Sequence, residues 1–225
     1  MQVVLTCLKE LGFVYEEETD DHDVLRSLFF MHSDSFKVWR TFPEIMIMDA
    51  TYKTNVYNMP YFEIVGATST GQTFLIASCF MYNEKEPTYV WVLECLKRRL
   101  VTGMRVRVII TDREQALINA SEYVFPEAKL QLCRFHIHQN LEKHVKKGGV
   151  DLEFLPNVSG WWRNVVNNSL TEDQYNTNLE NFRNNVAMFP GIQILIIVIL
   201  EDHDMDTYVL ICRVVQVYGA QLVIR

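Results

Sequence analysis

The sequence predicts an α/β fold in which a mixed β-sheet is flanked by helices and followed by an all-helical segment. Two apolar runs, at 44–49 and 106–112, each deliver an aspartate at their end, as buried strands do at the ligand-binding edge of an α/β sheet. From about residue 44 to 145, strand-like and helix-like hydrophobic periods alternate. The fold prediction rests on these two observations. The apolar content of 49% is sufficient for such a fold to bury a hydrophobic core.

Residues 1–40 are predicted to be mostly helical and polar, with the acidic run 16–21 as an exposed break. The run 44–49 predicts the first strand. Two further strands, 61–68 and 73–81, flank the polar, glycine-containing turn 69–72, which is a hairpin signal.

A helix then opens at Pro87, with apolar residues at helical spacing up to Leu100. A strand at 105–111, a helix at 114–124, a short strand at 129–132 and a helix at 134–147 complete the series. The resulting order, βββαβαβα, is the ribonuclease H-like order.

Residues after 148 change in character. The segment 149–190 is predicted to be helical, with Thr171 as the N-cap of a helix that ends near Val186. Beyond it, residues 191–225 form an atypical tail with no element predicted except a general strand tendency. The predicted organisation is therefore an N-terminal segment 1–40, a ribonuclease H-like core 41–148, a partial helical insertion 149–190 and the tail.

Net charge and cysteine content limit the classes of protein to which this chain can belong. The net charge of −7 counts against strong autonomous DNA binding, because free-standing DNA-binding domains carry a basic face. Five scattered cysteines are typical of reduced thiols in an intracellular protein. No signal peptide is recognisable, and the longest apolar run, 192–200, is too short to span a bilayer. We therefore expect a protein that is neither secreted nor membrane-bound.

Asp49 and Asp112 are the first candidate site residues. They lie 63 residues apart (112 − 49), so only folding can bring them together. Carboxylates at one sheet edge suit Mg²⁺, a hard cation that takes oxygen ligands and assists phosphoryl displacement. The alternative for each residue is that it ends a strand and caps the following turn.

Two further groups of residues are candidates with open alternatives. Cys133 and His136, three residues apart at a helix start, could share a zinc ion, although structural zinc takes four ligands. The alternative is that both residues are structural. Tyr52, Lys53 and Tyr57 follow Asp49 and could meet a nucleic acid, whereas core packing is the alternative for the tyrosines.

Taken together, the motifs resemble the catalytic core of Mutator-like element (MULE) transposases over residues 25–145. The segments that carry this resemblance are Phe29–His32, Phe42–Asn55, Met59–Pro60, Ile64–Gly66, Tyr89–Leu93, Ile110–Ala120, Phe125–Pro126 and Leu132–Asn140. No single segment is specific, whereas their ordered combination is.

The resemblance implies a ribonuclease H-like fold, a DDE triad and DNA cleavage and rejoining with Mg²⁺ or Mn²⁺. It implies that Asp49 is the first acid and Asp112 the second. Cys133 and His136 match the family's Cys-x-x-His signature and are thereby implied to serve the neighbourhood of the active site. The expected partner is transposon-end DNA, bound through flanking modules that this chain lacks, and a homo-oligomer is also considered. The expected location is the nucleus, or the cytoplasm for a fragment.

The chain departs from the family pattern after residue 190. In the family, the catalytic glutamate follows the helical insertion in a Glu-Ser-x-His-like context, which is absent here, and Glu201 is the nearest candidate for the third acid. We therefore expect the transposase domain to be truncated or altered at its C-terminus. Two main functions remain open: a transposase domain, and an inactive transposase-derived regulatory or interaction domain. An unrelated metal-dependent nuclease of the same fold is a third.

Overall fold

The computed structural model describes residues 2–52, 55–147, 152–169 and 171–189. By its internal contacts the chain divides into two compact units, Met1–Leu130 and Gln131–Arg225, which are described separately below. The division of the sequence into segments ending at 40, 148 and 190 stays a prediction.

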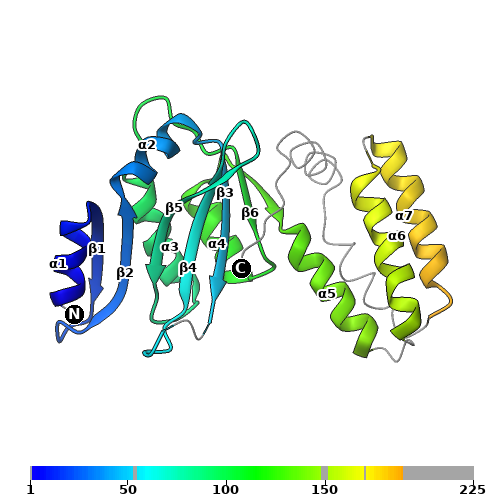
Figure 1. Cartoon of the computed structure of the whole chain (residues 1–225), viewed down its shortest axis with the longest axis horizontal. Helices are drawn as coiled ribbons and strands as arrows, with labels where there is room; N and C mark the ends of the chain where they lie inside the picture. The colour runs from blue at the N-terminus through cyan, green and yellow to red at the C-terminus, as the bar shows by residue number, and fades with distance from the viewer. Residues whose placement is uncertain (1, 53–54, 148–151, 170, 190–225) are drawn as a thin grey trace. The chain divides into compact units, whose positions relative to one another are not determined.

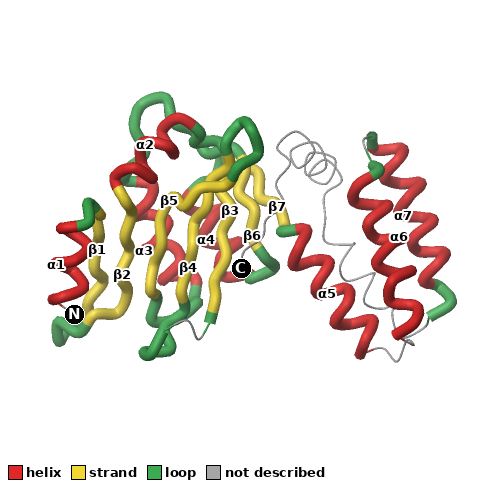
Figure 2. The backbone as a smooth tube through the Cα atoms, viewed as in Figure 1, coloured by secondary structure: helices red, strands yellow, loops and turns green. Residues whose placement is uncertain are grey.

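The first unit is built around a seven-stranded mixed sheet with the order β1-β2-β5-β4-β3-β6-β7 (Figures 1 and 2). β3 pairs with β4 antiparallel and with β6 parallel. Its elements are α1 (Gln2–Glu10), β1 (Phe13–Thr19), β2 (Leu25–His32), α2 (Ser33–Thr41), β3 (Ile45–Thr51), β4 (Tyr61–Ala67), β5 (Thr73–Phe80), α3 (Glu86–Lys97), β6 (Val108–Thr111), α4 (Gln115–Val124) and β7 (Lys129–Leu132), whose last two residues fall beyond the unit boundary.

The order from β3 onward is the predicted βββαβαβα, continued by α5 (Arg134–Lys147). The mixed sheet with flanking helices confirms the ribonuclease H-like fold class. The prediction for residues 1–40 is wrong in part, because 13–19 and 25–32 form the strands β1 and β2. Glu16, Glu17 and Glu18 lie in β1, which among the described strands is at the edge of the sheet, where charged side chains are well tolerated.

Helices α3 and α4 cover one face of the sheet (Figure 1). Their apolar residues pack with alternate residues of the central strands, so that Met46 and Met48 of β3 face this core and Phe62 meets Tyr89 edge-on at 5.3 Å. Because side chains alternate along a strand, Ile45, Ile47 and Asp49 point to the opposite face.

Gly66 of β4 is a position where the sheet leaves no room for a side chain. It pairs with Phe74 of β5, and a Cβ atom added at Gly66 would lie 2.4 Å from the Cζ atom of the Phe74 ring. The phenyl ring therefore occupies the space that a side chain at position 66 would need, so a larger residue there requires the ring of the half-buried Phe74 to move.

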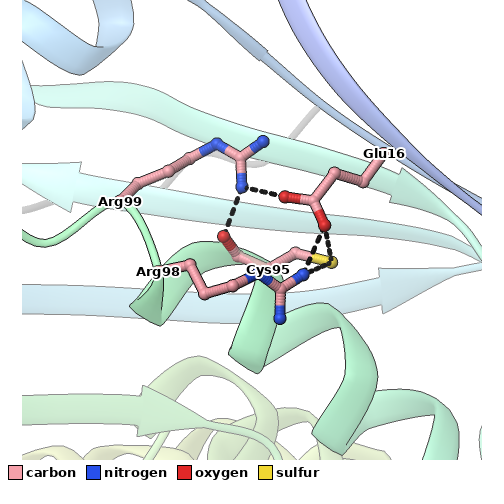
Figure 3. A network of polar contacts seen from close by, with 4 residues as sticks. All are labelled: Glu16, Cys95, Arg98 and Arg99. Atoms are coloured by element: carbon pink, nitrogen blue, oxygen red, sulfur yellow. Dashed lines mark hydrogen bonds and ion pairs between the residues drawn. The ribbon is translucent and has the colours of Figure 1, made fainter.

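A polar network ties the end of α3 to β1 (Figure 3). Arg98 and Arg99 both donate to the Glu16 carboxylate, the latter from Nη1 to Oε1 at 2.6 Å. The buried Cys95 thiol donates to Oε2 of Glu16 at 3.4 Å. Burial first, and the adjacent Glu16 charge second, raise the pKa of Cys95 to about 12, so that it stays a thiol.

The described part of the second unit is helical. It comprises α5, a short 3₁₀ turn η1 (Leu152–Phe154), α6 (Leu155–Asn167) and α7 (Glu172–Val186). Thr171 is the N-cap of α7, as predicted, with its hydroxyl accepting the backbone N–H of Gln174 at 3.2 Å. Residues of all three helices share a separate apolar core, in which the rings of Trp162 and Phe182 lie 5.5 Å apart. The predicted tail, residues 191–225, lies outside the described residues.

Among the described residues, no helix combines the length and the apolar character needed to cross a bilayer.

Candidate active site

The strand register places the two candidate aspartates level with each other on neighbouring strands. β3 and β6 are parallel, and Ile47 pairs with Ile110, an offset of 63 residues (110 − 47). The same offset separates Asp49 from Asp112, which directly follows β6. Because adjacent strands lie about 4.8 Å apart, this register sets the two backbones within a distance that two carboxylates can span around one ion. Both side chains are half-buried.

Glu63 extends the acidic row on the other side of Asp49. It pairs directly with Asp49 in the antiparallel β3–β4 ladder, so both side chains project from the same face. Residues so paired have Cβ atoms about 5 Å apart, and like charges at such positions destabilise a sheet. Sequence reasoning missed Glu63, although the alternation along 61–68 placed it on the polar side of a predicted strand.

Asp112 also performs the turn role considered as its alternative. Its Oδ1 atom accepts the backbone N–H of Glu114 at 3.2 Å, which shapes the approach to α4. Glu114 is the N-cap of that helix, and its carboxylate accepts the N–H of Ala116 at 3.4 Å. A carboxylate has two oxygens and about four lone-pair positions, so the turn does not exhaust the acceptor capacity of Asp112.

Glu84 is a further acid that the sequence analysis did not single out. It precedes α3, is half-buried, and accepts a hydrogen bond at 3.3 Å from the hydroxyl of the fully buried Tyr89. Its local sequence gave no signal beyond proximity to a helix start, because its position depends on tertiary packing.

The charge environment of Glu84 links it to the predicted pair. Burial raises the pKa of the Glu84 carboxyl, and the hydrogen bond from Tyr89 acts in the opposite direction. The negative charges of Glu114, Asp112 and Asp49 raise the pKa further, and the net shift is upward. The interaction places Glu84 within electrostatic range of the other three carboxylates, at the end of the sheet where β3 and β6 finish.

The carboxylate pair fits a hard divalent cation. Mg²⁺ is commonly held by one or two protein carboxylates while it keeps several waters or takes phosphate oxygens, and ligation by Asp49 and Asp112 stays a prediction. The described residues contain no group of three or more histidine, cysteine, aspartate or glutamate side chains arranged to hold a metal. The predicted zinc site thus has two ligands, Cys133 and His136, where a structural zinc takes four.

Cys133 and His136 lie at the start of α5 in the second unit, where they interact with each other. Burial would raise the pKa of the Cys133 thiol. Hydrogen bonds from the His136 side chain and from the N–H groups of His136 and Phe135 outweigh it and hold the pKa below the ordinary value. This pairing is compatible with the structural alternative, and metal ligation stays a prediction.

Of the other candidate residues, two are exposed and two lie outside the described residues. Tyr52 and Tyr57 expose 62% and 75% of their surface, which excludes core packing for both. Lys53 and Glu201 lie outside the described residues.

Comparison with known proteins agrees with the sequence motifs. The family described as "MULE transposase domain" matches residues 45–140, a span that contains Asp49, Glu84 and Asp112. Protein FAR1-RELATED SEQUENCE 5 of Arabidopsis thaliana is 25% identical over 142 residues, which are 61% of this chain and 18% of that protein. Protein FAR-RED IMPAIRED RESPONSE 1 of Arabidopsis thaliana is 22% identical over 197 residues, 77% of this chain and 23% of that protein.

A third relative differs in name. The PKS-NRPS hybrid synthetase cheA of Chaetomium globosum is 28% identical over 137 residues, which are 59% of this chain and 3% of that protein. The chain thus spans less than a quarter of each of these three relatives, and the likeness concerns a segment that proteins of different names share. The family match, residues 45–140, lies within the span 25–145 over which the motifs resemble MULE transposases.

Proposed function

We propose that this chain carries a MULE-type DDE transposase activity, namely metal-dependent cleavage of DNA phosphodiesters followed by strand transfer. The observation that supports it is the parallel register of β3 and β6 inside the matched segment, in which Ile47 pairs with Ile110, two residues before Asp49 and Asp112. A sheet edge with two level carboxylates is suited to hold a cation against a phosphodiester.

When bound, Mg²⁺ or Mn²⁺ supplies Lewis-acid stabilisation of charge that develops on phosphodiester oxygens. Asp49 and Asp112 would hold the ion, and the sheet fixes their separation before any ligand arrives. The turn bond from the Glu114 N–H to Asp112 restricts the rotation of that carboxylate. The chain's contribution is therefore pre-organisation of two oxygen ligands on rigid strands.

The test is Mn²⁺ binding, measured by electron paramagnetic resonance, together with nicking of supercoiled plasmid in Mg²⁺ and in Mn²⁺. Asp49→Asn removes one anionic ligand while it keeps the shape of the side chain. We expect it to weaken Mn²⁺ binding at least tenfold and to reduce nicking by a larger factor.

Asp21→Asn is the matched control, because Asp21 is an exposed aspartate of the β1–β2 turn in the same unit. It should bind and nick like the unmodified chain. If Asp49→Asn and Asp21→Asn bind Mn²⁺ equally well, Asp49 is not a ligand and the proposed site is wrong.

A second candidate is a catalytically inactive, transposase-derived regulatory or interaction domain. The name of one Arabidopsis relative, FAR-RED IMPAIRED RESPONSE 1, refers to a response to far-red rather than to transposition and favours it. This candidate predicts that the chain does not nick plasmid in Mg²⁺ or in Mn²⁺. It also predicts that the unmodified chain and Asp49→Asn have the same circular dichroism spectrum and the same affinity for DNA. Metal-dependent nicking that disappears in Asp49→Asn would eliminate it.

Both candidates act on or near DNA, and we propose a nuclear location for the chain. Confocal imaging of a fluorescent fusion tests this, with the fluorescent protein alone as the control. Exclusion of the fusion from the nucleus, with the control evenly distributed, would contradict it.

A further inference from the structure

The connection between β3 and β4 exposes two aromatic rings and a valine close to the candidate site. The last residue pair of this hairpin is Thr51 with Tyr61. In the connection that follows, Tyr52 is 62%, Val56 89% and Tyr57 75% exposed. Large apolar side chains gathered on one short exposed segment mark an interaction site more often than single ones do.

Val56 and Tyr57 lie on a hydrogen-bonded turn. The Asn55 side chain donates from Nδ2 to the Met59 carbonyl at 2.7 Å, and its Oδ1 accepts the N–H groups of Tyr57 at 3.1 Å and Met59 at 3.2 Å. The Asn58 N–H donates to the Asn55 carbonyl at 3.1 Å, and Asn58 itself adopts a positive φ of 53°. Asn55 therefore closes the turn beneath Val56 and Tyr57 and leaves their side chains in solvent.

The position of this tip relative to the acids suggests its ligand. Asp49 lies two residues before Thr51 in the same strand, and strand residues advance about 3.4 Å each, so the base of the hairpin is roughly 7 Å from Asp49. Glu63, opposite Asp49, lies on the returning strand. If a DNA strand binds with one phosphate at Asp49, its neighbouring bases would therefore lie next to the β3–β4 connection.

The charge of the chain argues for stacking over phosphate attraction. The net charge is −7, and Glu63 and Glu84 add negative charge beside the aspartates. Glu63, Glu84 and the aspartates repel a polyanion, so these described residues contribute no affinity for DNA through charge. Base–aromatic stacking tolerates any sequence and contributes without a positive charge.

We propose that the β3–β4 tip, formed by Tyr52, Val56 and Tyr57, binds an unstacked DNA strand next to the phosphodiester at the acids, with Tyr57 as the principal stacking residue. The inference rests on the proposed function for its ligand class. The inference adds to the proposed transposase activity a surface that binds the bases next to the cleaved phosphodiester.

The test is fluorescence anisotropy of the full chain with a labelled 20-nucleotide oligothymidylate, with the matching duplex as a second probe. Tyr57→Ala should weaken binding of the single strand about 5- to 100-fold, because stacking is worth ~1–3 kcal/mol per base and 1.4 kcal/mol is tenfold. The slope of affinity against salt concentration should stay unchanged, because no phosphate contact is lost. Tyr57→Phe keeps the ring and should retain the affinity.

Tyr123→Ala is the matched control. Tyr123 is 72% exposed near the end of α4, and its removal should leave binding unchanged. Equal affinity of Tyr57→Ala and the unmodified chain, or an equal loss in Tyr123→Ala, would overturn the inference, as would failure of the unmodified chain to bind either probe.

Measurements on the unmodified chain and on Tyr57→Ala in EDTA separate this inference from the proposed function. Tyr57-dependent binding of the oligonucleotide should persist in EDTA, because stacking needs no divalent ion. Tyr57-dependent binding in a chain that also binds Mn²⁺ and nicks DNA supports both ideas. Tyr57-dependent binding in a chain that neither binds Mn²⁺ nor nicks DNA contradicts the enzyme and leaves the stacking surface standing.

Discussion

At the scale of single residues, Asp112 combines two roles that its sequence context presents as alternatives. One oxygen accepts the Glu114 N–H and forms the turn before α4. The register of β6 sets the same residue level with Asp49. The turn therefore orients a carboxylate rather than replacing its use as a ligand, and the two interpretations of a strand-end aspartate are compatible.

The candidate aspartates could be found from the sequence because each follows an apolar run that predicts a buried strand. Glu63 and Glu84 could not be found in the same way. Glu63 joins the site through the β3–β4 pairing, and Glu84 through the packing of Tyr89 in the core. Both contacts depend on tertiary structure, which a hydrophobic period along the chain does not encode.

Replacement of Glu84 should alter the pH dependence of stability. Burial and the neighbouring acids raise the pKa of Glu84 above its ordinary 4.5. The folded state thus binds this proton more tightly than the unfolded chain does. The associated stability is full below pH 4.5 and is lost as pH rises through the folded-state pKa. Glu84→Gln should therefore gain stability relative to the unmodified chain as pH rises above about 4.5.

Urea unfolding at several pH values between 3 and 8, without divalent ions, measures this effect. Glu86→Gln is the control, because Glu86 is exposed and its carboxylate accepts a hydrogen bond from Asn119 instead. The stability difference between Glu84→Gln and the unmodified chain should change with pH. A constant difference would show that folding does not raise the pKa of Glu84.

At the scale of elements, strong hydrophobic periods predicted β3 to α5 in order and within a few residues. β6 is shorter than predicted and begins at Val108 rather than at 105. β1 and β2 were missed because the sequence of β1, Phe13–Thr19, contains three glutamates. That composition is unusual for a central strand, but β1 has a strand partner on one side only.

The stability that the Glu16 hydrogen-bond network between β1 and the end of α3 provides should decrease at acidic pH. Burial acts to raise the pKa of Glu16, but hydrogen bonds from Arg99, Arg98 and Cys95 outweigh it and lower the pKa below 4.5. A depressed pKa in the folded state gives stability that is present above pH 4.5 and is lost as pH falls through the folded-state pKa. This dependence has the opposite sign to that of Glu84.

Glu16→Gln should cost on the order of 1 kcal/mol at pH 7, because charge-assisted bonds to a partly buried carboxylate are lost. The difference should shrink as pH falls below 4.5. Chemical denaturation at pH 7 and pH 3 measures both values. Glu17→Gln, one residue away on the exposed side of β1, should be neutral. An equal cost for both variants would contradict the structural role of the network.

At the scale of the whole molecule, the described residues form two separate hydrophobic cores. One lies between the sheet and α3 and α4. The other joins α5, α6 and α7. Domains with their own cores can open independently of each other. The contacts divide the chain into Met1–Leu130 and Gln131–Arg225, and the segment boundary at residue 148 stays a prediction.

Trp162→Ala should destabilise the second core alone. Trp162 is 2% exposed, and removal of a buried tryptophan costs about 3–5 kcal/mol. Hydrogen exchange followed by mass spectrometry should show faster exchange in α6 and α7 and unchanged exchange in β3, β4 and β5. Phe62→Ala, in the first core, should give the reverse pattern. Faster exchange throughout the chain in both variants would show that the two units unfold together.

The pair of Gly66 and Phe74 has a consequence for how this domain can change during evolution. The phenyl ring occupies the volume of a Cβ atom at position 66. A larger residue at 66 therefore requires either a shift of the Phe74 ring or a smaller side chain at position 74. Among descendants of this domain, we expect the two positions to substitute together, which would make them a covarying pair that reports the β4–β5 register without a structure.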